Sequence, residues 1–139
     1  MRIVRKAGVV AVVAAVASGC AARPVAEVKA GECFNFSAEA TEVSTVVVVE
    51  CAGPHAAEAF EVFDVALDAF DATAIAAAAD EGCLGAFEAY VGYPYNAADF
   101  YYRALTPGAD GWENGARRVV CLVVAKEGTL TGSVKRSGT

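Results

Sequence analysis

Apolar residues follow different patterns in different parts of the chain, and each pattern predicts a different element. Residues 7–17 form an uncharged apolar run behind three cations. The run TVVVVEC at residues 45–51 is rich in β-branched side chains and predicts a strand inside a sheet or buried on both faces. Gly53 and Pro54 end that strand. The apolar run at residues 7–17 therefore differs from the remainder of the chain, which has the pattern of a globular domain.

A second strand is predicted where apolar and acidic residues alternate over residues 57–67. Simple alternation would place Glu58, Phe60, Val62 and Asp64 on one side of this strand. Ala59, Phe63 and Val65 would then lie on the other side.

From Asp71 onward the spacing of apolar residues changes to that of a helix. Asp71 is a suitable N-cap residue and Gly92 a suitable C-terminal stop. Between them, apolar residues recur at steps of four and define one buried face. These residues are Ile75, Ala79, Cys83, Phe87 and Val91.

The last third of the chain predicts a second helix and a hairpin. Asn96, with Asp99 three residues later, resembles a capping box, so we expect a helix over 96–105, followed by a loop that carries Trp112. Residues 117–125 and 129–134 are expected to pair as a hairpin around the turn KEG. This order predicts an α+β fold, an antiparallel sheet of about five strands with two helices packed on one face.

The N-terminal run has the features of a secretory signal. Its cations precede an apolar stretch that is much shorter than the roughly 20 residues needed to span a membrane. The residues Ala17-Ser18-Gly19 before Cys20 resemble the lipobox of bacterial lipoproteins. That resemblance implies cleavage before Cys20 and lipidation of its sulfur, including palmitate. Several acyl chains on one residue suffice for stable attachment to a membrane.

These features divide the chain into three parts. We expect a lipoprotein signal peptide at 1–19, a lipidated N-terminus and short tether at 20–27, and a folded domain at 28–139. The protein would then be held at the cell membrane, on its extracytoplasmic face. Without residues 1–19 the charge changes from −6 to −9, because 8 cations remain against 17 acids. Such an acidic chain is not expected to bind nucleic acid.

Four cysteines remain when Cys20 is set aside, and outside the cytoplasm they are expected to form disulfides. Four cysteines allow three connectivities, and the sequence alone does not choose among them. We favour Cys33–Cys51, which would tie the opening segment to the end of the valine strand, and Cys83–Cys121, which would join the long helix to the C-terminal hairpin. A thiol oxidoreductase is less favoured, since no two cysteines form a Cys-x-x-Cys pair.

A zinc site is an alternative to these disulfides. Cys51 and His55 could contribute to one, but the other spacings match no zinc finger or ribbon, and oxidation competes for the thiols. We therefore expect no metal and no other cofactor.

Several segments together resemble the septum formation family of actinobacterial envelope proteins. They are VKAGECF, VVVVECAGPHAAEAFEVF, AADEGCLGAFEAYVG, GWENGARRVVCLV and GTLTGSVK, between Val28 and Lys135. The residues that match the family pattern are Cys51, Pro54, His55, Glu58, Trp112, Gly115 and Cys121. The resemblance implies a link to cell division and envelope or septal proteins as partners, but no catalytic activity.

No motif in the sequence indicates catalysis. His55 is the only histidine, and we expect it to be a turn residue bonded to local backbone. The aromatic residues between Tyr90 and Trp112 are expected to pack in the core, with an aromatic ligand groove as the alternative. We predict a non-catalytic binding or scaffold module in which His55, Glu58 and Trp112 are the candidate binding residues. The alternative is an envelope hydrolase using His55 or a carboxylate pair.

Overall fold

The fold was analysed in a computed structural model, which describes residues 22–36 and 44–137. Cys20 and the predicted signal peptide lie outside these residues. The elements in chain order are β1 (Ala22–Pro24), the 3-10 turn η1 (Val25–Glu27), β2 (Cys33–Phe36), β3 (Thr45–Val49), β4 (Pro54–His55), β5 (Ala57–Asp64), α1 (Ala72–Val91), the 3-10 turn η2 (Tyr95–Ala97), β6 (Phe100–Leu105), α2 (Ala109–Glu113), β7 (Arg118–Ala125) and β8 (Leu130–Thr131).

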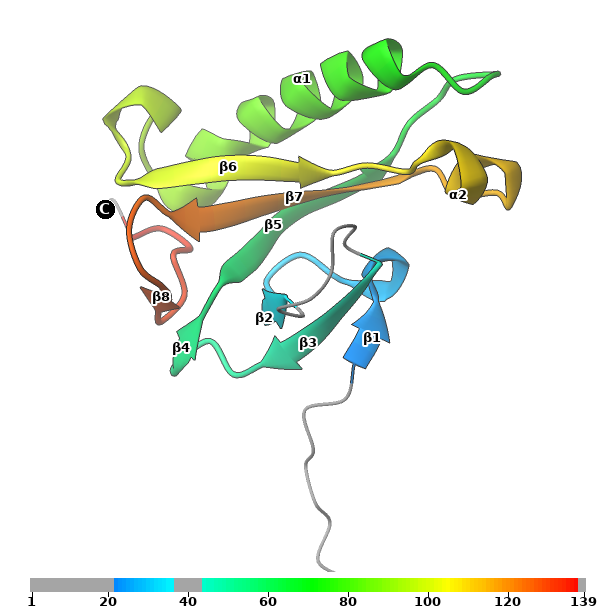
Figure 1. The fold of residues 1–139 in the computed structure, drawn as a ribbon. Helices are drawn as coiled ribbons and strands as arrows, with labels where there is room; N and C mark the ends of the chain where they lie inside the picture. Colours follow the sequence, from blue (N-terminus) through cyan, green and yellow to red (C-terminus); the bar gives the residue numbers. More distant parts are fainter. Residues whose placement is uncertain (1–21, 37–43, 138–139) are drawn as a thin grey trace, which may run out of the picture.

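The predicted α+β architecture is confirmed. A six-stranded antiparallel sheet has the order β1-β3-β2-β5-β7-β6, and β4 and β8 form a separate two-stranded sheet. Helix α1 lies along β5, β7 and β6 on one face of the sheet (Figure 1). The sheet has six strands rather than about five because β1, in the residues that we assigned to the tether, and β6 add two strands, whereas β8 pairs with β4 outside this sheet.

Helix α1 forms as its sequence pattern predicts. The Asp71 carboxylate accepts a hydrogen bond from the Ala74 N–H at 3.0 Å and caps the first turn. Gly92 ends the helix with φ 99°, a left-handed conformation that favours glycine. The predicted apolar stripe from Ile75 to Val91 is buried against the sheet.

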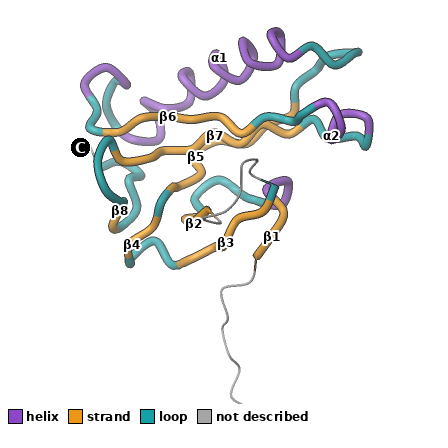
Figure 2. Tube along the Cα trace, in the orientation of Figure 1, coloured by secondary structure: helices purple, strands orange, loops and turns teal. Residues whose placement is uncertain are grey.

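The helix predicted over 96–105 is wrong, because residues 100–105 form β6 (Figure 2). Phe100, Tyr102 and Ala104 pack against the core beneath α1 while Tyr101 is exposed, which is the two-residue period of a strand. Aromatic residues favour such a half-buried sheet surface. The second helix is instead α2, in the segment that we expected to be a loop.

The predicted hairpin between 117–125 and 129–134 is also wrong. Strand β7 forms, but β5 and β6 already pair with its two edges. No edge of β7 is left for the returning chain, so β8 pairs with β4, with Leu130 opposite His55. The C-terminal segment therefore crosses back to the turn that carries the only histidine of the chain.

Two strands depart from the simple patterns of their sequences. A register shift between Ala59 and Glu61 interrupts the alternation in β5. As a result, Phe60 and Phe63 both pack on the α1 side, and Val62 faces the opposite side, contrary to our expectation. Strand β3 is internal, as predicted, but only Val46 is fully buried and the valines after it are half-buried.

Both favoured disulfides are present. Cys33 in β2 is bonded to Cys51 after β3, with 5.2 Å between their Cα atoms. Cys83 in α1 is bonded to Cys121 in β7, with a Cα separation of 5.4 Å. Both separations are typical of disulfides. The first bridge closes the N-terminal half of the sheet, and the second joins the long helix to the central strands.

Candidate functional site

His55 is held inside the molecule by the local backbone. It is in β4, directly after the turn formed by Gly53 and Pro54, and its side chain is fully buried. Its Nδ1 lies 2.8 Å from the Gly53 carbonyl oxygen, to which Nδ1–H donates. The expected bond to local backbone is therefore confirmed. The buried Nε2 has no hydrogen-bond partner within the described chain, and as the unprotonated nitrogen it is an acceptor.

Glu58 in β5 is fully buried, yet its carboxylate is well supplied with donors. Oε1 accepts hydrogen bonds from the Tyr90 hydroxyl at 2.6 Å and the Ser133 hydroxyl at 2.7 Å. Oε2 accepts one from the Val134 N–H at 2.9 Å. Glu58 thus connects β5 to helix α1 and to the C-terminal segment. Burial of a carboxylate is tolerated only with such compensation.

The hydrogen bond to Glu58 also affects the pKa of the Tyr90 phenol. Partial burial, and then the hydrogen bond to Glu58, raise the pKa of Tyr90 well above its ordinary value. The phenol therefore remains protonated and donates its hydrogen to Glu58.

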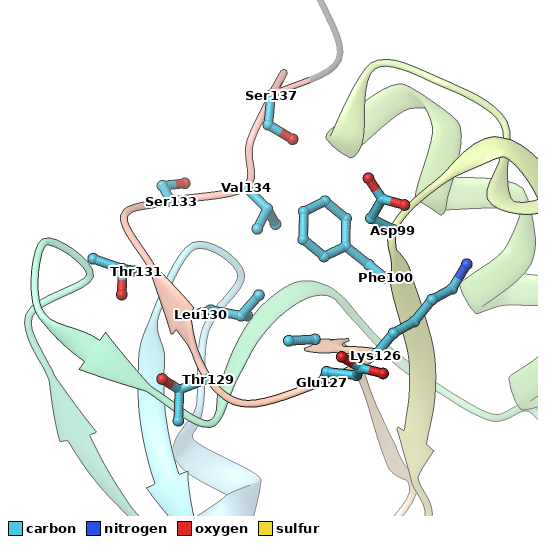
Figure 3. Close-up of a pocket in the computed structure, with 11 residues that line it drawn as sticks. Asp99, Phe100, Lys126, Glu127, Thr129, Leu130, Thr131, Ser133, Val134 and Ser137 are labelled. Atoms are coloured by element: carbon cyan, nitrogen blue, oxygen red, sulfur yellow. The ribbon is translucent and has the colours of Figure 1, made fainter.

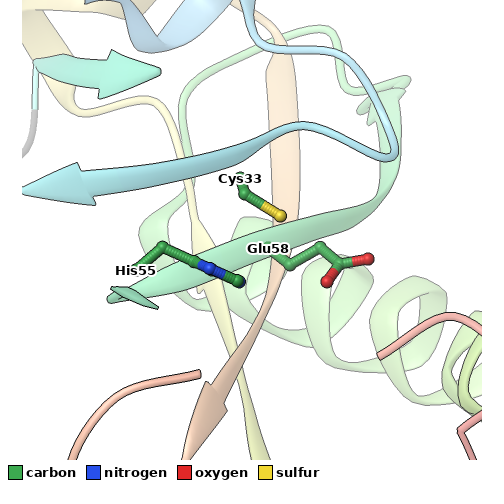
Figure 4. Close-up of side chains that lie close together, drawn as sticks. All are labelled: Cys33, His55 and Glu58. Atoms are coloured by element: carbon green, nitrogen blue, oxygen red, sulfur yellow. The ribbon is translucent and has the colours of Figure 1, made fainter. Parts of the chain in front are cut away.

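His55 and Glu58 come together with Cys33 in one buried cluster (Figure 4). One potential ligand atom from each of the three side chains lies within 4.8 Å of the others. The three residues come from three different strands, β2, β4 and β5. In the oxidised protein Cys33 Sγ is bonded to Cys51, so the cluster then offers one nitrogen and one carboxylate.

Trp112 does not belong to this cluster. It lies in α2 and is 7% exposed, with its ring covered by the Arg117 guanidinium 3.5 Å from the ring centroid. Phe70 packs against the ring at a centroid distance of 6.1 Å. Arg117 also donates hydrogen bonds to the carbonyl oxygens of Trp112 and Ala116. Trp112 thus has internal contacts and offers little surface for binding.

The aromatic residues predicted to pack in the core do so. Tyr95 contacts Phe87 and Tyr102 edge-on, at centroid distances of 5.2 Å and 5.0 Å. These contacts fill the space between α1, η2 and β6 rather than line an opening. Tyr101, which is 48% exposed, is the exception.

An open groove of about 590 Å³ lies between the start of β6, the end of β7 and the C-terminal segment (Figure 3). Its polar residues include Asp99, Lys126 and Glu127, and Leu130 and Val134 contribute apolar surface. Ser133 also lines it and donates its hydroxyl hydrogen to buried Glu58. The groove is therefore coupled to the buried cluster by a hydrogen bond.

Sequence reasoning identified His55 and Glu58 but missed their surroundings. Ser133 and Val134 are more than 70 residues from Glu58 along the chain, and they reach it because β8 pairs with β4. No local pattern signals that pairing. Tyr90 could have been found, since it follows Phe87 by three residues at the edge of the buried face of α1.

The fold and the site define a small disulfide-bonded α+β domain with a buried polar cluster beside an open groove. Comparison with known families gives one match, to a family described as septum formation, over residues 30–139. The chain therefore belongs to the septum formation family, as its motifs indicated. No curated protein and no solved structure matches the chain. Among the described helices, none is both long and apolar enough to span a membrane.

Proposed function

We propose that the protein is a lipid-anchored, non-catalytic binding module of the cell envelope that serves septum formation. Its partners would be envelope or septal proteins on the outer face of the cytoplasmic membrane. The family match supports the connection with septum formation. The signal-like run before Cys20 and the two disulfides support a location where thiols become oxidised.

The observation that carries the non-catalytic assignment is the state of His55, which the hydrolase alternative would use, and of the carboxylate of Glu58. His55 and Glu58 are both fully buried. His55 uses one nitrogen to bond the backbone, and the Glu58 carboxylate is surrounded by three donors. A general base must reach a proton on the substrate, and neither group faces solvent. Their role is to hold the fold together.

The groove in Figure 3 is the best candidate surface for a partner. It combines exposed charged residues with apolar side chains, as protein-binding surfaces commonly do. It also lies beside β6, an edge strand of the sheet whose outer edge could accept an extended segment. Charge reversal at exposed Glu127 should weaken partner binding, because this residue is at the groove.

Crosslinking in intact cells tests this function. A chain with Glu127→Lys should capture less of its partner than the unmodified chain. Glu113→Lys is the matched control, since Glu113 is also exposed but lies in α2, outside the groove. Equal capture by both variants would contradict the assignment of the groove. Turnover of an envelope substrate by the purified protein, lost with His55→Ala, would instead establish the hydrolase.

A further inference from the structure

We propose that reduction of the Cys33–Cys51 disulfide creates a zinc site from these two thiolates, His55 and Glu58. The proposal goes beyond the binding function above and does not depend on it. Its starting point is the cluster in Figure 4, in which Cys33, His55 and Glu58 are all buried and their ligand atoms lie within 4.8 Å. Cys51 is bonded to Cys33, so a second sulfur adjoins the cluster.

His55 is already arranged as a metal ligand. Histidines that bind metals commonly donate their other ring N–H to a backbone carbonyl or a carboxylate, which fixes the tautomer and the ring. Here Nδ1–H donates to the Gly53 oxygen, and the lone pair of Nε2 is left buried without a partner among the described residues. Leaving a buried polar atom unpaired is costly, so a buried Nε2 without a hydrogen bond favours binding of a partner. A metal ion would be such a partner.

Glu58 can also supply a ligand without losing its present contacts. A carboxylate offers about four acceptor positions. The hydroxyls of Tyr90 and Ser133 use two of them on Oε1, and the Val134 N–H uses one on Oε2. One acceptor position on Oε2 remains. Because three donors from α1 and the C-terminal segment hold the carboxylate, little ordering would be needed when an ion binds.

The four ligands suit zinc in number and kind. Zinc prefers four ligands in a tetrahedron, drawn from thiolate, imidazole and carboxylate groups. Bonds of about 2.0–2.3 Å place such ligands about 3.3–3.8 Å apart. One potential ligand atom from each of Cys33, His55 and Glu58 lies within 4.8 Å of the others, so these three need only a small contraction. The sulfur atoms must separate, which cleavage of their bond allows.

The redox step needs a dithiol reductant. One of its thiolates attacks Cys51 Sγ, forms a mixed disulfide and releases Cys33 as a thiolate. The second thiol of the reductant then displaces Cys51, so the dithiol becomes a disulfide and two electrons and two protons pass to the cysteine pair. Zn²⁺ displaces the thiol protons on binding. Cys51 is half-buried, whereas Cys83 and Cys121 are fully buried, so the first bridge is the more accessible one.

Metal titration of the full chain carrying Cys20→Ser tests the proposal, since only the four bridge cysteines then remain. The chain is reduced with a phosphine and titrated with Zn²⁺, and with Co²⁺ as a spectroscopic probe. We expect one tightly bound ion per reduced chain, a tetrahedral Co²⁺ spectrum with sulfur ligands, and no such binding by the oxidised chain. His55→Gln should weaken Zn²⁺ binding at least tenfold.

A second measurement avoids the risk that a variant fails to fold. After reduction, the unsubstituted bridge cysteines are alkylated with and without Zn²⁺ and located by mass spectrometry. Zinc should protect Cys33 and Cys51 but not change the labelling of Cys83 and Cys121. If the reduced chain binds no more Zn²⁺ than the oxidised one, if His55→Gln binds it as tightly, or if zinc protects neither Cys33 nor Cys51, the proposal is wrong.

Discussion

Glu58 connects the C-terminal segment to β5 and α1. It is fully buried and accepts hydrogen bonds from α1 and from the segment after β8. A hydrogen bond to a buried charged group contributes more than one between neutral groups. The sequence indicated Glu58 as a candidate binding residue. The structure shows that it is paired.

Replacing Glu58 by Gln should destabilise the fold. In Gln, an NH₂ group replaces one of the two carboxylate oxygens. This group is a donor and cannot accept a hydrogen bond, so at least one of the three hydrogen bonds to Glu58 would be lost. We expect a loss of about 1–3 kcal/mol in the free energy of unfolding. Urea denaturation measures it, with Glu88→Gln as the control because Glu88 is exposed on α1. Equal stability of the two variants would contradict this role for Glu58.

Tyr90 should make the stability depend on alkaline pH. Its pKa is raised in the folded protein, first by burial and then by Glu58, whereas the unfolded phenol titrates at about pH 10. The stability that this difference provides is fully present below about pH 10 and is lost as the pH rises toward the folded pKa.

Urea denaturation between about pH 8 and about pH 11 tests this dependence. The free energy of unfolding should fall above about pH 10, and it should fall less steeply in Tyr90→Phe. Tyr101→Phe removes an exposed phenol of the same size and should change the slope less. If both variants keep the full slope, the coupling of Tyr90 to Glu58 is not its source.

At the scale of elements, α1 was predictable and the segments around β7 were not. The helix has a cap, a stop and a five-residue apolar stripe, all encoded locally. Residues 96–105 carry a capping-box pattern that competes with the strand preference of Phe100, Tyr101 and Tyr102, and pairing with β7 decided the outcome. The place of β8 depends on which edges of β7 are free, which is a property of the whole sheet.

Two glycines of α1 should respond differently to substitution. A Cβ on Gly85 would meet nothing within 4 Å, so Gly85→Ala should stabilise the helix by about 1 kcal/mol. A Cβ on Gly82 would lie 2.5 Å from Cζ of Phe63, so Gly82→Ala must displace that ring and should stabilise less or destabilise. Thermal unfolding of the two variants compares them. An equal gain in both would show that Phe63 does not restrict Gly82.

The two disulfides should differ in their contribution to stability. They close loops with sequence separations of 18 and 38 residues. In the chain-entropy account, the shorter loop contributes about 3 kcal/mol and the longer one about 4 kcal/mol. Replacing Cys83 and Cys121 by Ala should therefore lower the free energy of unfolding more than replacing Cys33 and Cys51. Denaturant titration of both double variants measures the difference, and the reverse order would contradict this account.

At the scale of the whole molecule, the sequence allowed a correct prediction of the fold class, the bridges and the family. Four cysteines allowed three connectivities, and the pairing that we favoured is the one present. The contacts of Glu58 with Ser133 and Val134 were not predictable, since they depend on the crossing of the C-terminal segment to β4. Nothing in the local sequence marks the groove that this crossing forms.

The proposed lipid anchor concerns the whole molecule, and it predicts where the protein is found. With the anchor, the chain should remain with the membrane fraction after salt washing, because acyl chains and not charge would hold this acidic protein there. Cys20→Ala removes the residue proposed to be acylated and should release the chain from that fraction. A variant that stays bound to the membrane would contradict anchoring through Cys20.

Intact mass spectrometry of the protein extracted from its native cells, without reduction, tests the central claim most directly. The account predicts a chain that begins at Cys20, carries acyl groups, and lacks two hydrogen atoms for each of its two disulfides. An unprocessed chain beginning at Met1, without acyl groups and with all of its thiols reduced, would contradict it.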